Sequence, residues 1–311
     1  MSHYKYLIVG SGMTADAAVD GIRQVDPEGA IGLIGAEVEP PYNRPPLTKG
    51  LWQGKPFEKI WRGTPTKKGV TLHLGRTVQS LMNMESGIRY SHGKSPFDDM
   101  ARFWLSPDIR KELKSVKPCS YGDGYFFYND IHLHLLNRII DSRISDLSVD
   151  INHNLWQYLK PTANALFCMD SLSKGFLKMD GGMVIAPYDL AKFGLLYAND
   201  GVIHGNQVLD GAWCANLKNS KGVRTDSEYW DLYRRMNHSW YPILREGRTY
   251  YKNFWWGFTQ ADGPNDIYAM GILGQFVYVS TRNNVVIVRQ GNSWGVKGWW
   301  PYIFEELAAK V

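Results

Sequence analysis

The chain has 311 residues, of which 44% are hydrophobic and 21% charged, a globular composition that excludes a disordered or fibrous protein. Its net charge of +5 comes from 35 basic and 30 acidic residues spread along the chain, which disfavours nucleic-acid binding. The 3 cysteines are widely spaced and form no CxxC pair, as in a reducing compartment, and we find neither a secretory leader nor a long apolar run. We therefore expect a cytoplasmic protein with no nucleic-acid partner, no membrane partner and no metal centre.

Aromatic residues divide the chain near residue 77. The sequence holds 12 Phe, 18 Tyr and 12 Trp, and only six of these precede residue 78. The pattern of apolar residues changes at the same place, from a strand and helix alternation to amphipathic helices followed by late strands. The sequence therefore predicts two domains, residues 1–77 and residues 78–311.

The first domain begins with a strand, a helix and a second strand. Apolar residues 4–9 end at a glycine, a helical pattern covers residues 15–25, and a second apolar run covers residues 31–34. The turn between the first strand and the helix reads GxGxxA, with Gly10, Gly12 and Ala15 at the fixed positions. In that setting the glycines let a pyrophosphate approach the backbone, and Glu37 stands where an acid can bind a ribose hydroxyl. The pattern predicts a Rossmann-like βαβ fragment; an ordinary glycine turn is the alternative.

Residues 4–77, with PPYNRPPLTKGLW and KKGVTLHLGRTV, resemble the opening of the FAD-dependent ferredoxin and putidaredoxin reductases, of the pyridine-nucleotide-disulfide reductase type. The resemblance implies FAD as a cofactor. It stops near residue 78, before the rest of the FAD domain and the NAD domain of that family. We therefore expect this fragment to bind the adenosine half of FAD, with no protein residues to surround the isoalloxazine ring. The flavin contacts that the resemblance implies are Gly10, Gly12, Ala15, Glu37, Arg44, Pro45 and Lys49.

The second domain begins with amphipathic helices, such as residues 131–141 and 187–197. Two strands follow, residues 269–280 and 284–289, joined by a short polar turn at residues 281–283, which predicts an antiparallel hairpin. A helix over residues 300–310 closes the chain. The pattern predicts an antiparallel sheet with helices, an α+β domain.

Several blocks of the second domain resemble the serine β-lactamase and penicillin-binding-protein superfamily, in the class C-like branch of esterases and 6-aminohexanoate-dimer hydrolases. They include VQSLMNMESGIRY, GYFFYNDIHLHLLNRII, APYDLAKFGLLYANDGVIHGNQVL and YAMGILGQFVYVSTRNNVVIVRQG. The resemblance implies ester or amide hydrolysis by a serine that is activated within an SxxK motif, because a serine hydroxyl at its free pKa is a weak nucleophile.

The resemblance assigns roles to two further motifs. Tyr128 would act as base or proton shuttle, with Asp130 at the position of the usual asparagine. The third motif falls on residues 272–274, where Ile272 replaces the usual lysine or histidine, and Gly274 and the Gln275 amide would frame an oxyanion hole. Asp130 is alternatively the N-cap of the following helix. The predicted catalytic residues are Tyr128, Asp130, Gly274 and Gln275.

The nucleophile segment of this family is absent, because the residues upstream of the SGIRY block are those that resemble the flavoprotein. Literal SxxK matches occur at residues 91–94 and 171–174, beside glycines and prolines that disfavour a helix. Residues 291–295 spell GxSxG between a strand and a helix, the setting of a nucleophile elbow, but we expect that strand to belong to a hairpin and the segment to be a linker.

The remaining candidates have structural explanations. His132 and His134 are two residues apart, so on a helix they point to different faces, and we expect them to be exposed or half-buried rather than metal ligands. The pairs at residues 255–256 and 299–300, both Trp-Trp, would line a substrate pocket or, more simply, pack in the core.

The sequence thus predicts a serine hydrolase-like protein, inactive if its nucleophile segment is truly missing. The alternatives are a module that binds FAD or an adenine nucleotide, and a non-functional fusion of two gene fragments. An incomplete hydrolase sheet would expose part of its apolar core. The free energy lost in this way would exceed the small net free energy of unfolding of a domain. We therefore expect marginal folding, or assembly with a second copy or a complementing chain.

Overall fold

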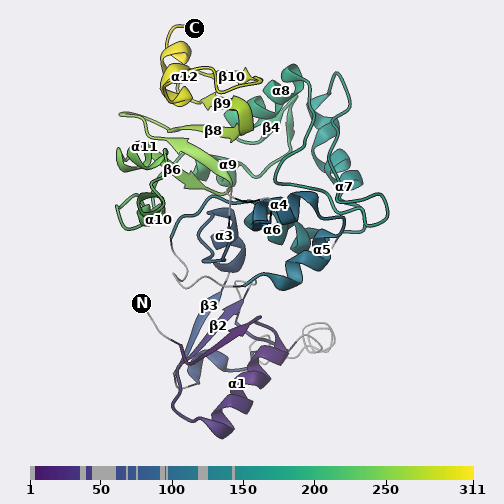
Figure 1. Cartoon of the computed structure of the whole chain (residues 1–311), viewed down its shortest axis with the longest axis vertical. Helices are drawn as coiled ribbons and strands as arrows, with labels where there is room; N and C mark the ends of the chain where they lie inside the picture. The colour runs from purple at the N-terminus through teal and green to yellow at the C-terminus, as the bar shows by residue number, and fades with distance from the viewer. Residues whose placement is uncertain are drawn as a thin grey trace. The chain divides into compact units, whose positions relative to one another are not determined.

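A computed structural model describes residues 4–35, 40–43, 61–67, 69–74, 76–91, 95, 97–117, 125–141 and 144–311. The chain divides into two compact units, Met1–Ser80 and Leu81–Val311, whose helices and strands are labelled in Figure 1. No helix within these ranges is long and apolar enough to cross a membrane.

The N-terminal unit is a small parallel α/β fold. Its elements are β1 (Tyr6–Val9), α1 (Met13–Val25), β2 (Ile31–Gly35), the 3₁₀ turn η2 (Thr64–Thr66) and β3 (Val70–Leu74). The three strands run parallel in the order β1-β2-β3. Ala15 and Val19 of α1 pack against Ile31 and Leu33 of β2, which buries one face of the helix. The predicted strand, helix and strand are confirmed.

The C-terminal unit begins with helices. The boundary helix is α3 (Arg76–Met82), followed by α4 (Asp99–Leu105), α5 (Ile109–Glu112), η3 (Leu113–Ser115), α6 (Ile131–Asp141), α7 (Leu147–Asn154), η4 (Trp156–Leu159) and α8 (Pro187–Ala198). Later helices are α9 (Gly211–Leu217), α10 (Asp231–Arg235), α11 (Tyr241–Arg245) and α12 (Trp300–Ala308). Aspartate side chains accept hydrogen bonds from first-turn N–H groups at the starts of α4, α5, α7 and α9, so the sequence itself marks where these helices begin.

A five-stranded antiparallel sheet forms the body of this unit. It contains β6 (Thr249–Lys252), β7 (Trp255–Phe258), β8 (Asp266–Gly271), β9 (Gln275–Ser280) and β10 (Val285–Arg289), in the order β10-β9-β8-β7-β6. A two-stranded ribbon, β4 (Val202–Ile203) with β5 (Asn206–Gln207), lies apart from it in the chain. The predicted hairpin is confirmed as β9 and β10, with Ser280 paired to Val285.

The single strand predicted over residues 269–280 is wrong. A turn, η5 (Ile272–Gly274), splits it into β8 and β9, which pair with each other. Leu273 and Gly274 both have positive φ, at 60° and 78°, and this left-handed backbone is what reverses the chain within three residues.

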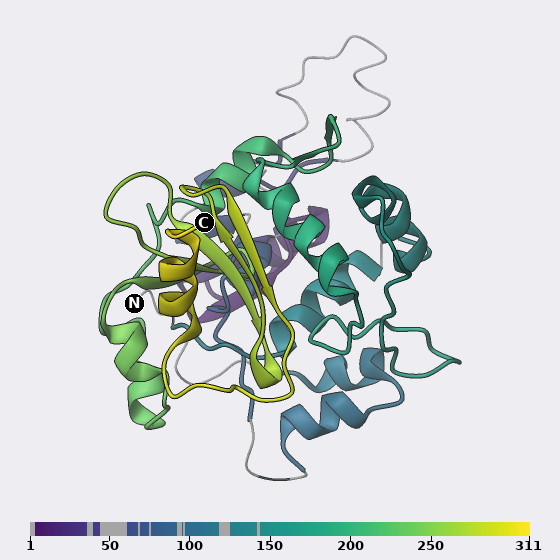
Figure 2. The same ribbon diagram turned by 90° about the horizontal axis from the view of Figure 1, so that it is seen from above.

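Helices cover the two faces of the sheet. Figure 2 shows α8 and α12 on opposite sides of it. Along β9, Phe276 and Tyr278 belong to the cluster that includes α12, while Val277 and Val279 belong to the cluster that includes α8, as the two-residue period of a strand requires. A Cβ built on Gly194 of α8 would lie 2.5 Å from a methyl group of Val286, so α8 packs closely against β10.

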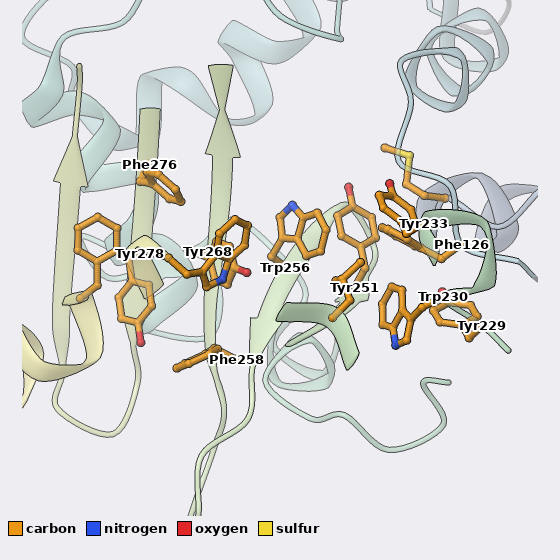
Figure 3. Packing of buried hydrophobic residues seen from close by; sticks show 14 residues of the cluster. Phe126, Tyr229, Trp230, Tyr233, Tyr251, Trp256, Phe258, Tyr268, Phe276 and Tyr278 are labelled. Atoms are coloured by element: carbon orange, nitrogen blue, oxygen red, sulfur yellow. The ribbon is translucent and has the colours of Figure 1, made fainter. Parts of the chain in front are cut away.

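The larger core cluster is mainly aromatic (Figure 3). The Trp-Trp pair at residues 255–256 divides between the two faces of the sheet, with Trp255 in the α8 cluster and Trp256 in the α12 cluster. Both are buried, as is Trp299. These tryptophans pack in the core, which is the simpler of the two interpretations made from the sequence. The labelled side chains in Figure 3 are Phe126, Tyr229, Trp230, Tyr233, Tyr251, Trp256, Phe258, Tyr268, Phe276 and Tyr278.

Candidate functional site

The GxGxxA turn lies between β1 and the N-terminus of α1. Gly10 has a φ of 125°, a conformation that favours glycine, and Gly12 is the N-cap of α1 with no side-chain hydrogen bond at the cap. A Cβ built on either glycine meets no atom of the described residues within 4 Å, so with respect to these residues the backbone here faces open space. Ala15 is 6% exposed and packs against the sheet. An uncapped helix N-terminus beside an open glycine turn suits an anion such as a pyrophosphate.

A charged cluster holds residues 61–67 against α1. Arg62 and Lys67 form ion pairs with Asp16 at 2.7 and 2.9 Å, and the Thr64 hydroxyl donates to the same carboxylate. Burial would raise the pKa of Asp16, but the hydrogen bonds from Lys67, Thr64 and Arg62 outweigh it and lower that pKa. The carboxylate therefore stays ionised and neutralised in the first turn of α1. Together with Asp20 and Asn43 the cluster lines a depression of about 410 Å³.

The other implied flavin contacts cannot be placed. Glu37, Arg44, Pro45 and Lys49 lie outside the described residues.

In the C-terminal unit, Tyr128 is half-buried among aromatic rings. It stacks on Trp256 with ring centroids 5.6 Å apart and meets Trp240 and Tyr251 edge to face. Burial, and then the negative charge of Asp130, raises the pKa of Tyr128 to about 12. The phenol is therefore protonated at neutral pH, which opposes its predicted role as a base.

Asp130 points to a different partner. Its carboxylate accepts a 2.9 Å hydrogen bond from the Tyr90 hydroxyl. The side chain of Asn129, which is 1% exposed, accepts instead from the backbone N–H of Ile131 at the start of α6. Asn129 and Asp130 are thus held by hydrogen bonds within the helical part of the unit, whereas Tyr128 packs against aromatic rings of the sheet.

Side-chain hydrogen bonds stabilise the turn η5, on which the third predicted motif falls. The side-chain amide of Gln275 accepts from the Gly291 N–H at 3.1 Å and donates to the Gly291 carbonyl. Arg289 donates to the carbonyl of Gly274 and, at 3.1 Å, to that of Ser293. At the tip of the turn Ile272 is 85% exposed. The turn keeps its shape, and its tip carries an exposed apolar side chain at the position where the sequence resemblance would place a lysine or histidine.

Aromatic rings connect the two predicted motifs. Trp240 contacts both Tyr128 and Trp299, Trp299 contacts Trp294, and Trp294 contacts Phe276, the residue after Gln275. Across the described ranges, no hydrogen bond joins Tyr128 to Gly274 or Gln275. The structure therefore brings these residues into one unit without assembling them into a hydrogen-bonded catalytic group.

The candidate serines are engaged in turns. Ser91 donates to the Asp99 carboxylate at 2.9 Å, and Lys94 lies outside the described residues. The Ser171 hydroxyl donates to the carbonyl of Pro107, and residues 172–174 form a turn, so the expectation that this match is not helical is confirmed. Ser293 is exposed in a bend, and α12 begins only at residue 300, which does not match a nucleophile elbow.

The expectation that the two histidines are exposed or half-buried is wrong. His132 is 1% exposed and His134 is fully buried, because α6 is enclosed on more than one face. His134 stacks on Phe103 and lies 3.4 Å from the carboxylate of Asp180. Burial lowers the pKa of His132 to about 4. Among the side chains that the structure describes, no three of His, Cys, Asp or Glu gather as a metal site would need.

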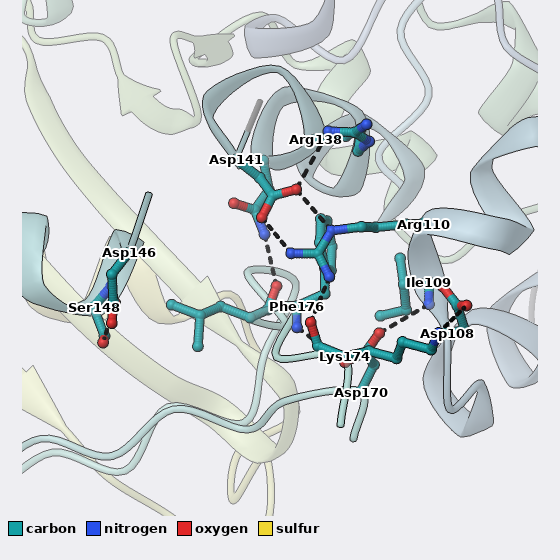
Figure 4. A network of polar contacts seen from close by, with 12 residues as sticks. Asp108, Ile109, Arg110, Arg138, Asp141, Asp146, Ser148, Asp170, Lys174 and Phe176 are labelled. Atoms are coloured by element: carbon teal, nitrogen blue, oxygen red, sulfur yellow. Dashed lines mark hydrogen bonds and ion pairs between the residues drawn. The ribbon is translucent and has the colours of Figure 1, made fainter. Parts of the chain in front are cut away.

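Sequence reasoning missed a polar cavity between α5, α6 and α7, whose neighbouring polar contacts are drawn in Figure 4. Its lining residues come from distant parts of the chain, such as Arg110, Asn137 and Lys174. The sequence signal near it is the SxxK match at residues 171–174, which indicates a candidate serine nucleophile rather than part of a binding cavity.

No family model matches the chain. The ferredoxin reductase subunit of 5,5'-dehydrodivanillate O-demethylase from Sphingobium sp. is 38% identical over 104 residues, which cover 30% of this chain and 25% of that protein. The mitochondrial apoptosis-inducing factor 1 of Dictyostelium discoideum is 49% identical over 55 residues, covering 18% of this chain and 10% of that one. The chain therefore spans a quarter or less of the length of these relatives.

Among solved structures, a Bacillus anthracis protein assigned as a 6-aminohexanoate-dimer hydrolase has a similar fold, with a TM-score of 0.58 at 19% sequence identity. The match covers 75% of this chain and 59% of that one. The N-terminal segment thus resembles FAD-dependent ferredoxin reductases and apoptosis-inducing factor, and the structure resembles the fold of the Bacillus anthracis protein.

Proposed function

We propose that the N-terminal unit binds FAD through its ADP portion. The observation that carries this proposal is the open glycine turn at Gly10 and Gly12, directly before the uncapped N-terminus of the 13-residue helix α1. The free N–H groups and positive dipole end of such a helix stabilise a pyrophosphate, and a turn without Cβ atoms lets it come close. The sequence identity to the reductase subunit supports the same ligand.

FAD supplies two-electron redox chemistry when it is bound. The residues of this chain would hold and orient its ADP portion, with Ala15 keeping α1 close to β2 so that the helix N-terminus points at the turn. Because the chain spans only a quarter of the reductase subunit, we do not extend that protein's activity to this one.

Replacing Gly12 with valine should lower the affinity for FAD and for ADP by about tenfold or more, about 1.4 kcal/mol. A Cβ at this position meets no atom of the described residues within 4 Å and φ is −87°, so we expect the fold to accept valine while its side chain fills the space meant for the ligand. The matched control is Gly21→Val, which lies in the middle of α1 and also faces open space. Isothermal titration calorimetry measures both variants.

Comparing FAD, ADP and FMN in the same titration shows which part of FAD is bound. FAD and ADP should bind with similar affinity, because the ADP portion makes the contacts, and FMN, which lacks the adenosine, should bind far more weakly. Equal binding of FMN and FAD, or equal loss in the Gly12→Val and Gly21→Val variants, would contradict the proposal.

A second candidate function is ester or amide hydrolysis by the C-terminal unit, favoured by the fold it shares with the Bacillus anthracis protein. The geometry supports it less well, because Tyr128 has a pKa of about 12 and the Ser171 hydroxyl donates to a backbone carbonyl. Loss of the nucleophile in serine hydrolases typically costs about a million-fold in turnover.

The expected result with a fluorophosphonate is therefore an unchanged intact mass of the folded protein. Peptide mapping of an adduct to Ser91, Ser171 or Ser293 would instead identify a working nucleophile and make hydrolysis the leading function. A heat-unfolded sample serves as the control for non-specific labelling.

A further inference from the structure

The helical part of the C-terminal unit contains a cavity of about 320 Å³, at the small end of the range for small-molecule sites. It lies among α5, α6, α7 and the loop of residues 169–177, and none of the predicted catalytic residues Tyr128, Asp130, Gly274 and Gln275 is among its lining residues. The lining residues are Arg110, Asn137, Asp141, Ser145, Asp146, Leu147, Ser148, Met169, Lys174, Gly175 and Leu177.

One side of the cavity is basic, and some of its N–H groups can still donate hydrogen bonds to a ligand. The guanidinium of Arg110 has five N–H groups. Two of them bind the carboxylate of Asp141, and a third donates to the carbonyl of Lys174 at 2.6 Å. The ammonium of Lys174 is half exposed and lies 3.6 Å from the Asp108 carboxylate, too far for a hydrogen bond. Donors on both side chains are therefore available to an anionic group.

The opposite side is acidic. Asp146 caps α7, and its Oδ1 atom accepts all three hydrogen bonds, from the Ser148 hydroxyl and from the N–H groups of Ser148 and Val149. Its other oxygen, Oδ2, is left for a ligand. The hydrogen bond from the Ser148 hydroxyl lowers the pKa of Asp146, so the carboxylate is charged at neutral pH. Figure 4 shows Asp146 and Ser148 on one side of the network and Arg110 and Lys174 on the other.

Asn137 of α6, another lining residue of the cavity, carries an unpaired acceptor. Its side chain is 2% exposed, and its amide N–H donates to the Leu177 carbonyl at 2.7 Å. Its carbonyl oxygen, Oδ1, is buried and has no hydrogen-bond partner. A buried acceptor without a donor is unfavourable by about 1 to 3 kcal/mol, so an N–H group brought in by an occupant would be stabilising.

From this separation of charge we propose that the cavity binds a small zwitterion, an amino acid or dipeptide. Its ammonium would be held by Asp146 and Asn137, and its carboxylate by Lys174 and Arg110. Among the described lining residues, two are cations, Arg110 and Lys174, and two are carboxylates, Asp141 and Asp146, so a ligand without net charge keeps these four charges balanced. The proposal does not depend on FAD binding by the other unit.

The test uses the whole chain and isothermal titration calorimetry with glycylglycine. N-acetylglycylglycine, which lacks the ammonium, and glycylglycinamide, which lacks the carboxylate, should each bind at least about tenfold more weakly, because a charge-assisted contact is lost. Similar binding of all three ligands, or no saturable binding of glycylglycine, would overturn the proposal.

Two variants test separately the contact to the ligand's ammonium and the contact to its carboxylate. Asp146→Asn keeps the Oδ1 cap of α7 and replaces only the ligand-facing oxygen with a donor, so glycylglycine affinity should fall about tenfold with an unchanged melting temperature. Asp210→Asn, at the N-cap of α9, is the matched control. Lys174→Met should also lower the affinity, and Lys111→Met on α5 should not. Wild-type affinity in both cavity variants would contradict the assignment.

Discussion

Replacing Trp256 with alanine is expected to lower the free energy of unfolding of the C-terminal unit by about 3 to 5 kcal/mol. Trp256 is 1% exposed, and its ring lies 4.9 to 6.2 Å from five other aromatic rings. Rigid rings on all sides cannot collapse into the space that the indole leaves, so both the lost burial and the cavity are destabilising. The contacting rings are those of Phe126, Tyr128, Trp240, Tyr251 and Tyr268.

Urea unfolding followed by near-ultraviolet circular dichroism measures this change. Phe97→Ala is the control, because that ring is 91% exposed and its removal should change the unfolding free energy by less than about 0.5 kcal/mol. If the two variants unfold at the same urea concentration, the aromatic cluster does not stabilise the unit as described.

The second large effect is a loss of stability in mild acid caused by His132. Burial lowers its pKa from 6.5 to about 4 in the folded chain, so between these values the unfolded chain binds more protons. Stability therefore falls as the pH falls through this window. The difference amounts to about 2 kcal/mol between pH 7 and pH 5, and to about 3 kcal/mol below pH 4.

The variant His132→Gln removes this titration and keeps a neutral polar side chain. Urea unfolding at pH 7 and pH 5 should show a smaller loss of stability in the variant than in the wild type, by about 2 kcal/mol. A wild type and a variant with parallel pH profiles would mean that His132 is solvated in the folded chain.

The sequence predicted those elements whose signals are local. The GxGxxA turn needs glycine at position 10 for its positive φ, and an alanine at position 15 to pack α1 on β2, so spacing alone located both. The start of α8 carries Pro187 at a first-turn position, which is favourable there because the missing N–H would have no partner in the helix. Such features depend on neighbours a few residues away.

The reversal between β8 and β9 was not predicted, because Ile272 and Leu273 continue the apolar run of the strand. The signal was the pair Gly271 and Gly274, which bracket them at turn spacing. The apolar tip is exposed where a strand interior would have been buried, so hydrophobicity by itself was misleading there.

The cavity and the buried histidines could not be inferred from spacing. Arg110 meets Asp141 across 31 residues, and Lys174 lies near Asp108 across a longer separation. Only the packing of α5 and the 169–177 loop around α6 brings these charges together. The same enclosure explains why His132 and His134, on different faces of one helix, are both buried.

The brace formed by Gln275 and Arg289 makes two surface segments open together. The Gly291 N–H lies outside the regular strands, yet it donates to Gln275 Oε1 at 3.1 Å, and Arg289 joins the carbonyls of Gly274 and Ser293. We therefore expect turn and loop to unfold locally as one unit, with the Gly291 amide exchanging its hydrogen more slowly than an amide in an unbraced loop.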